Sequence, residues 1–313
     1  MINTQLLQQQ FAEGLDLFLK GCSDSALYDP IQYLLSLKSK RIRPLLAMSV
    51  CQAEGGSVED GMPSALAIEL FHNFTLMHDD IMDEAPIRRG DATAHVKFGE
   101  NAAILSGDVM FVLAYEALEQ ASELPQLLRM LNTTAKEVCE GQQQDMEFEG
   151  RDNVTSSEYL EMIRLKTSVL LAASCAMGAI SAGASNERVG LWYEFGEKLG
   201  LAFQIQDDYL DTFGEQKHTG KRVGGDILSD KKTYLRIQTQ AKTELPDTSN
   251  CSESEKIDVI RQLMVDTGAN VDAKTLMNEY SADAFNSLQK LRLDEGVNQW
   301  FSALLNSITE RLS

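Results

Sequence analysis

The chain has 313 residues, of which 43% are hydrophobic, and a formal net charge of −19 at pH 7. This length and apolar content can bury a large core. The acidic excess argues against nucleic-acid binding, because a polyphosphate backbone requires a basic surface that displaces its counterions. No apolar run approaches the roughly 20 residues of a transmembrane segment, and MINTQLLQQQ does not resemble a signal peptide, so we expect a cytoplasmic protein.

The composition predicts an all-α fold, because the chain has only six prolines and long stretches rich in Ala, Leu, Met, Glu and Gln. The first helix that can be delimited has about six turns, with an apolar run over residues 65–82. Asp60 is a candidate cap, Pro63 lies near the first turn, and Ala85-Pro86 ends the helix. Since it is apolar nearly all round, we expect this helix at the centre of the fold.

Further helices are expected over residues 101–119, 127–147, 156–182, 187–210 and 232–242. Thr155 and Glu158 have the spacing of a capping box before the third of these. Residues 213–230 are rich in glycine and charge and are expected to form a mobile loop over a site. No linker separates the motifs described next, so we predict a single domain over residues 1–313.

The helix over residues 65–82 ends in an acidic motif, His78-Asp79-Asp80-Ile81-Met82-Asp83. At 100° per residue, Asp79 and Asp83 lie on one face of a helix, one turn apart, with Asp80 beside them. Repulsion between these carboxylates is tolerated where solvent or a divalent cation neutralises it. Taken alone, the motif is also explained as an exposed acidic helix end.

A second copy of this pattern follows 128 residues later, with Asp207, Asp208 and Asp211 at the end of another apolar helix. If the two helices pack side by side, the two motifs face each other across a cleft and offer hard oxygen ligands to Mg²⁺. Mg²⁺ takes only one or two carboxylates directly and completes its shell with water and substrate phosphates. The pair of motifs therefore predicts a metal-assisted diphosphate site.

Two basic clusters suit a second anion. Lys38, Lys40, Arg41 and Arg43 precede Pro44, and Arg88-Arg89 follow the first acidic motif by five residues. Guanidinium groups bind diphosphate oxygens in pairs, and lysine supplies a point charge. His72 lies two turns before Asp79; a buried histidine there is a candidate ligand, or a structural hydrogen-bonding residue.

These motifs resemble those of the trans-isoprenyl diphosphate synthases, closest to the geranylgeranyl type, over essentially the whole chain. They are, in order, SKRIRP, NFTLMHDDIMDEAPIRRG, EGQQQD, LKTSVL, GLAFQIQDDYLD, GKRVGGD and DKKT. The resemblance implies an all-α orthogonal helical bundle around a central cavity, assembled as a homodimer. One departure is Ser39, where the family usually has glycine.

The resemblance also implies roles for individual residues. Three Mg²⁺ ions would be bound by Asp79, Asp83 and Asp207, with support from Asp80, Asp208 and Asp211. The allylic diphosphate would be held by Arg88, Lys166, Lys221 and Lys231, and isopentenyl diphosphate by Lys40, Arg43, His72 and Arg89. Thr167 and Gln204 match residues that lie beside the reacting carbons.

The reaction implied is head-to-tail condensation: the allylic diphosphate ionises, isopentenyl diphosphate attacks the carbocation, and a proton is lost, with pyrophosphate as the expected base. Phe74, five residues before Asp79, is the expected floor of the product cavity, with ordinary core packing as the alternative, and Thr75 beside it is small. We predict a C20 product, with C15 next. The other readings are a longer-chain polyprenyl synthase, a terpene cyclase and a catalytically silent subunit.

Overall fold

The protein is described by a computed structural model that covers residues 2–23, 25–214 and 223–309. About 75% of it is helical with almost no strand, which confirms the all-α prediction. Two compact units are resolved, one formed by residues 1–132 and 173–192 and the other by residues 133–172 and 193–313. The single domain expected over residues 1–313 stays a prediction.

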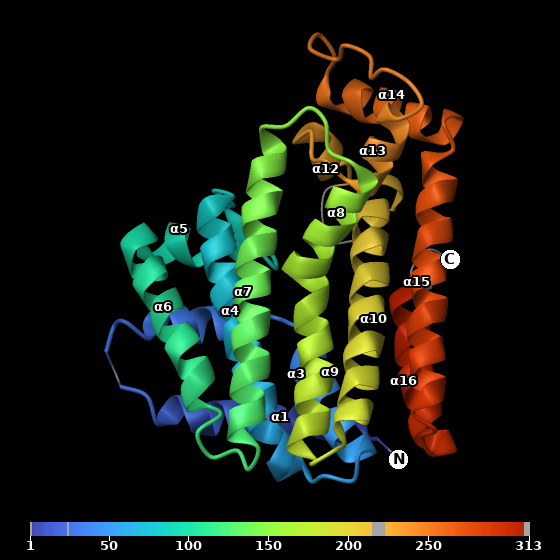
Figure 1. The fold of residues 1–313 in the computed structure, drawn as a ribbon. Coiled ribbons are helices and arrows are strands. Elements are labelled where there is room, and N and C mark those ends of the chain that lie inside the picture. Colours follow the sequence, from blue (N-terminus) through green and yellow to red (C-terminus); the bar gives the residue numbers. More distant parts are fainter. Residues whose placement is uncertain (1, 24, 215–222, 310–313) are drawn as a thin grey trace. The chain divides into compact units, whose positions relative to one another are not determined.

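The first unit contains most of the N-terminal elements (Figure 1). These are α1 (Thr4–Lys20), α2 (Asp29–Ser36), α3 (Ile42–Ala53), α4 (Val58–Met82), β1 (Ile87–Arg88), β2 (Asp91–Ala92), α5 (Ala94–Phe98) and α6 (Glu100–Glu116). α4 packs against α1, α3, α5 and α6. It is therefore central in its unit, as its apolar sequence indicates.

The start of α4 differs from the sequence expectation. Ser57 is the N-cap, and Asp60 is the third helical residue of a capping box in which each side chain bonds to the backbone N–H of the other. Pro63 lies inside the helix rather than in its first turn. Asp60 was therefore wrongly assigned as the cap, because serine and aspartate at this spacing satisfy the exposed N–H groups jointly.

Three helices contribute residues to both units: α7 (Leu124–Glu149), α9 (Val169–Ser181) and α10 (Asn186–Phe213). The second unit adds α8 (Ser156–Ile163), the π-helical turn η1 (Arg164–Ser168), α12 (Gly225–Leu228), α13 (Tyr234–Gln240), α14 (Glu253–Asp266), α15 (Ala269–Lys290) and α16 (Glu295–Thr309). Thr155 and Glu158 form the predicted capping box of α8. α10 and α15 run side by side (Figure 1), where Ser287 Oγ donates to Glu194 Oε2 at 3.2 Å.

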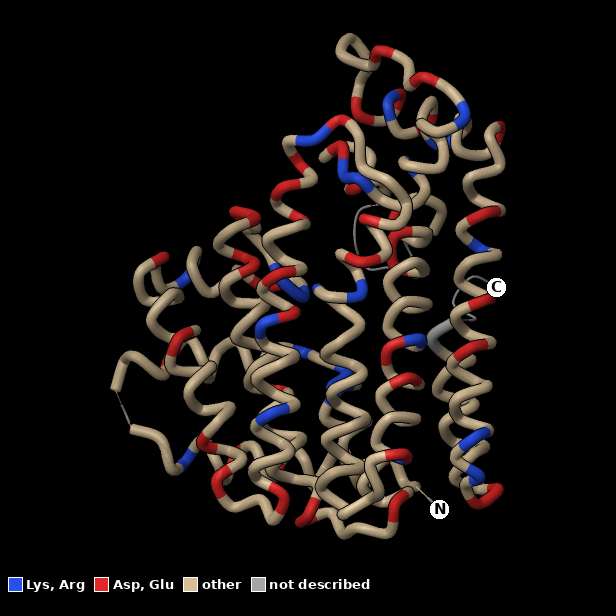
Figure 2. Tube along the Cα trace, in the orientation of Figure 1, with Lys and Arg blue, Asp and Glu red and all other residues tan. Residues whose placement is uncertain are grey.

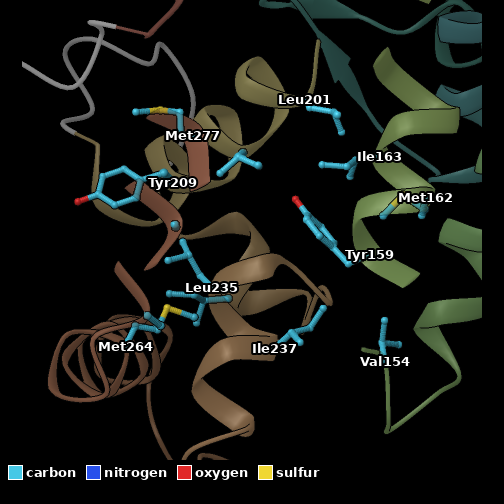
Figure 3. Packing of buried hydrophobic residues seen from close by; sticks show 14 of the residues in the cluster. Val154, Tyr159, Met162, Ile163, Leu201, Tyr209, Leu235, Ile237, Met264 and Met277 are labelled. Atoms are coloured by element: carbon cyan, nitrogen blue, oxygen red, sulfur yellow. The ribbon is translucent and has the colours of Figure 1, made fainter. Parts of the chain in front are cut away.

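The second unit is built around a hydrophobic cluster drawn from α7, α8, α10 and α12–α15. Tyr159 lies among its apolar side chains, which include Ile163 and Leu201 (Figure 3). Acidic residues are distributed along the helices of both units rather than gathered in one tract (Figure 2). Ser156–Ser181 is apolar and long enough to cross a membrane, but 83% of the apolar window is buried inside the protein, as in a core helix.

We predict that close packing in the first unit makes Gly178 of α9 intolerant of substitution. A Cβ atom there would lie 2.2 Å from the carbonyl oxygen of Ala47 in α3. Gly178→Ala should therefore lower the free energy of unfolding by about 1–3 kcal/mol. Gly190→Ala, in an open position of α10, should raise it by about 0.5–1 kcal/mol. Denaturant unfolding of both variants tests this, and equal effects would contradict it.

Candidate active site

The two acidic motifs occupy helix ends in different units, the first at the end of α4 and the second near the end of α10. In the first, Asp83 N–H donates to the carbonyl oxygen of Asp79 at 2.8 Å, so the two residues are one helical turn apart as predicted. Asp79 is half-buried and Asp83 is exposed. The mutual arrangement of the two motifs stays a prediction.

Asp80 differs from its neighbours because it is buried and bound to arginine. Arg88 Nε donates to both carboxylate oxygens at 2.8 Å, and Arg88 Nη2 lies 2.6 Å from Oδ1. A bidentate pair of this kind holds both partners in one geometry. Asp80 is thus directed into the protein, and the remaining N–H groups of Arg88 are left to bind an anion.

Arg88 is held in place by a two-stranded hairpin that sequence reasoning missed. β1 and β2 pair antiparallel, with Arg88 opposite Asp91. The turn residues Arg89 and Gly90 have φ values of 55° and 90°. Two consecutive positive φ values define the tight turn that suits a short hairpin. The Arg-Gly pair between two short extended segments is the sequence signal that could have revealed this hairpin.

The basic cluster predicted for a second anion is present in the first unit around Arg43. Arg43 Nη1 lies 3.2 Å from His72 Nε2, and Arg43 Nε has no hydrogen-bond partner among the described residues. Burial and, to a smaller extent, the charge of nearby Arg89 lower the pKa of Arg43 to about 10 against the opposing effect of Glu69. An incompletely bonded guanidinium in a basic, desolvated setting is suited to an anionic ligand.

His72 is neutral in this setting. Burial lowers its pKa well below 6.5, and the charges of Arg43, Arg89 and Arg88 lower it further. Because a guanidinium can only donate, Nε2 accepts from Arg43 and the ring proton is on Nδ1. Lys40 is exposed in the loop before α3.

The expected floor residue Phe74 belongs to an aromatic cluster on α4 and α6. Its ring stacks on Phe111 with centroids 5.0 Å apart and also contacts Phe71 and His78 at 5.6 and 4.8 Å. The neighbouring Thr75 hydroxyl donates to the carbonyl oxygen of His72 at 2.8 Å. Phe111 was missed by sequence reasoning, because only the packing of α6 on α4 brings it to Phe74.

In the second motif, Asp207 is exposed and Asp208 is buried. Asp208 accepts hydrogen bonds from the Tyr159 hydroxyl through Oδ2 and from Gln204 Nε2 through Oδ1, the latter at 3.0 Å. Thr167 Oγ1 donates to Gln204 Oε1 at 3.0 Å. Thr167, Gln204, Asp208 and Tyr159 thus form one hydrogen-bonded chain, which orients the two residues predicted to lie beside the reacting carbons.

Lys166 and Thr167 lie in the π-helical turn η1, between two closely approaching helices. A Cβ atom on Gly141 of α7 would lie 2.3 Å from Lys166 N, and one on Gly200 of α10 would lie 2.6 Å from Ser168 Cα. Lys166 Nζ donates to Asp145 Oδ2 at 2.6 Å. Asp145 ends the EGQQQD motif, and that pattern was the available signal for it.

Asp226 of α12 is a further acidic residue beside the second motif that was not singled out. Its backbone N–H donates to Asp211 Oδ1 at 2.9 Å. Burial and then the charge of Asp208 raise the pKa of Asp226 to about 7, while Lys231 lowers it. The expected ligand Lys221 lies outside the described residues.

No group of three or more His, Cys, Asp or Glu side chains converges on a possible metal site within the described part of the chain. Asp79 and Asp83 in one unit, and Asp207 in the other, are nevertheless hard oxygen donors at accessible helix ends. Such sparse carboxylate sets fit Mg²⁺, which keeps several waters and takes phosphate oxygens from its substrate.

An all-α fold with two acidic motifs and an incompletely bonded arginine cluster is typical of an enzyme that handles diphosphates. The polyprenyl synthetase family pattern matches residues 24–266. A geranylgeranyl diphosphate synthase of Methanosarcina mazei is 37% identical over 89% of this chain and 88% of its own length. A geranylfarnesyl diphosphate synthase of Aeropyrum pernix is 35% identical over 90% of this chain and 92% of its own.

The solved structures agree with these sequence matches. The crystal structure of a geranylgeranyl pyrophosphate synthase, 37% identical, covers 99% of both chains with a TM-score of 0.94. The chain belongs to the polyprenyl synthetase family and is a prenyltransferase. The resemblance drawn from its motifs is confirmed.

The buried acid Asp208 predicts a pH dependence of stability in the absence of divalent cations. Burial raises its pKa from 3.8 to about 6, although Lys231, Tyr159 and Gln204 lower it. At this group the folded state then binds more protons than the unfolded state, so the contribution of Asp208 to the free energy of unfolding should fall as pH rises from about 4 to about 6. Asp208→Asn should reduce that fall, by on the order of 2 kcal/mol.

Urea unfolding in a chelating buffer at several pH values measures this difference. Asp152→Asn, at an exposed position outside the cluster, is the control and should follow the wild-type profile. Parallel profiles for Asp208→Asn and wild type would show that Asp208 does not titrate in this way.

Proposed function

We propose that this prenyltransferase joins isopentenyl diphosphate head to tail to an allylic diphosphate, releases pyrophosphate and makes mainly a C20 product. The observation that carries the proposal is the shared design of the two motifs: the second aspartate of each is buried and bonded, and the first is more accessible. The family match and the names of the relatives support the same chemistry.

The proposed cofactor is Mg²⁺, with three ions bound by Asp79, Asp83 and Asp207 and supported by Asp80, Asp208 and Asp211. When bound, these ions would join the acidic motifs to the allylic diphosphate and stabilise pyrophosphate as the leaving group. Arg88, Lys166, Lys221 and Lys231 would bind the same diphosphate. Arg88 and Lys166 each have N–H groups beyond those used by Asp80 and Asp145.

The residues of the basic cluster suit the second substrate. Arg43, Arg89 and Lys40 would bind the diphosphate of isopentenyl diphosphate, and neutral His72 would donate through Nδ1. Once the allylic C–O bond has broken, the C4 carbon of isopentenyl diphosphate forms a bond to C1 of the allylic cation. Loss of a proton from C2 to the released pyrophosphate then restores a double bond.

Thr167 and Gln204 would stabilise the positive charge that develops on the allylic carbons. Their hydrogen bond fixes the Thr167 oxygen while leaving its lone pairs available, and the link from Gln204 to Asp208 orients the amide. Oriented oxygen dipoles stabilise a cation without reorganising during the reaction.

The proposed assembly is a homodimer, on the basis of the resemblance. A single catalytic domain and a location in the cytoplasm are also proposed. A longer product is the second candidate, since one relative is named a geranylfarnesyl diphosphate synthase. A terpene cyclase is disfavoured by the DDYLD sequence of the second acidic motif and by the basic residues that suit a second diphosphate. A catalytically silent subunit would be expected to have lost metal ligands or basic residues, and the sequence keeps both.

The proposal predicts that removing one accessible carboxylate abolishes most of the activity. Asp79→Asn and Asp207→Asn should each lower kcat about 100- to 1,000-fold or more, because each removes a proposed ligand of the Mg²⁺ ions that would neutralise the leaving group. The assay incubates the purified chain with Mg²⁺, isopentenyl diphosphate and each of dimethylallyl, geranyl and farnesyl diphosphate. Asp283→Asn, at an exposed position on α15, should keep wild-type activity. No condensation by folded wild type would refute the proposed function.

Product length provides a separate prediction. Phe74→Ala should shift the main product from C20 to C25 and longer, because it removes the ring that stacks on Phe111 and opens space along α4. Leu17→Ala, an exposed position on α1, is the control. Chromatography of the dephosphorylated products measures the change, and an unaltered distribution would place the floor elsewhere.

A further inference from the structure

The loop that carries Lys40 ends in an unusual backbone conformation. It lies between α2 and α3 and ends at Arg41, whose φ of 48° is in the left-handed region. A residue with a Cβ atom occupies that region at a cost on the order of 1 kcal/mol, so other contacts must hold it there. The hydrogen bond from Arg41 N to Ser39 Oγ, at 3.3 Å, is one such contact.

The Arg41 side chain supplies the stronger contacts. Nη2 donates to the carbonyl oxygen of Leu35 at 2.5 Å, and Nη1 donates to Glu69 Oε1 at 2.8 Å. The first bond closes the loop onto the last turn of α2, and the second ties it to the middle of α4. The guanidinium of Arg41 therefore faces the protein, whereas sequence spacing alone groups it with the anion-binding residues.

Glu69 is a buried carboxylate in the middle of the basic cluster. It is 1% exposed and also accepts a hydrogen bond from Asn73 Nδ2 at 3.0 Å. Its charge interacts with Arg43 and Arg89 as well as with Arg41. Guanidinium groups this close repel one another at low dielectric, and one buried carboxylate reduces that repulsion.

We propose that Arg41 and Glu69 form a positioning pair that holds the loop bearing Lys40, and with it Arg43, in the geometry that binds isopentenyl diphosphate. Neither side chain contacts the substrate. Arg41 fixes the path of the loop, and Glu69 fixes Arg41 and balances the charge of Arg43 and Arg89. The inference rests on the proposed function, because it concerns the substrate assigned to this cluster.

The first unit contains a matched ion pair for comparison. Glu54 is also a largely buried carboxylate, with a side chain 5% exposed, and Arg188 Nε and Nη2 donate to it at 2.5 and 2.7 Å. It also accepts from Trp192 Nε1 at 2.6 Å. Breaking either pair should lower stability, but only the Arg41–Glu69 pair should change substrate binding.

The test compares Arg41→Gln, Glu69→Gln, the double variant and the control Arg188→Gln. Calorimetry with Mg²⁺ measures the affinity for isopentenyl diphosphate in the presence of a non-ionising farnesyl S-thiolodiphosphate, and the affinity for that analogue alone. Each single variant should bind isopentenyl diphosphate about tenfold more weakly, equivalent to about 1.4 kcal/mol. The affinity for the allylic analogue should change less than about twofold. The double variant should bind isopentenyl diphosphate no more weakly than the weaker-binding single variant does.

Steady-state kinetics gives an independent readout. The KM for isopentenyl diphosphate should rise in the Arg41 and Glu69 variants while kcat and the allylic KM stay close to wild type. Arg188→Gln should lower the melting temperature without changing either KM. Arg41→Lys, which can keep the ion pair but not both bonds, should be intermediate and guards against misfolding of the glutamine variants.

An unchanged affinity for isopentenyl diphosphate in folded Arg41→Gln or Arg41→Lys would overturn the inference. An equal loss of affinity for isopentenyl diphosphate and for the allylic analogue would also overturn it. These outcomes leave the proposed function intact as long as the wild type condenses the two substrates. A wild type that neither binds isopentenyl diphosphate nor condenses it would instead refute the proposed function.

Discussion

Repulsion between adjacent carboxylates at a helix end is the constraint on which both acidic motifs depend. Consecutive residues of a helix point about 100° apart, so the second aspartate of each motif can turn inward while the first and last stay on the accessible face. Asp80 is neutralised by Arg88, and Asp208 is bonded by Tyr159 and Gln204. Each motif thereby separates a buried, bonded acid, Asp80 or Asp208, from the acids proposed to bind metal directly, which are Asp79, Asp83 and Asp207.

Burial disfavours charges of opposite sign in the two units. In the second unit, burial and neighbouring acids raise the pKa values of Asp208 and Asp226, which disfavours their negative charge. In the first, burial and neighbouring arginines lower the pKa values of Arg43 and Arg89, which disfavours their positive charge. A bound cation would relieve the former, and a bound diphosphate the latter. The same groups that reduce the stability of the empty protein therefore favour its ligands.

Sequence reasoning succeeded where local rules determine the structure. The helical period placed Asp79 and Asp83 on one face, and the Thr155 capping box marked the start of α8. It failed where tertiary packing decides. The π-helical turn lies close against two glycines from separate helices, and the Arg41 side chain turns inward to bind Glu69, 28 residues away. Neither contact can be predicted from the spacing of residues along the chain.

Product length illustrates the same limit. Relatives named as geranylgeranyl and geranylfarnesyl diphosphate synthases are almost equally similar to this chain, at 37% and 35% identity. Overall identity therefore does not distinguish the two product lengths. Its spacing to Asp79 identifies Phe74 as a candidate cavity floor. Its ring, however, stacks on Phe111, which in turn contacts Tyr115 with ring centroids 5.3 Å apart. If Phe74 limits the product, the limit is a property of the α4–α6 contact, and a change in α6 can alter it without touching the acidic motif.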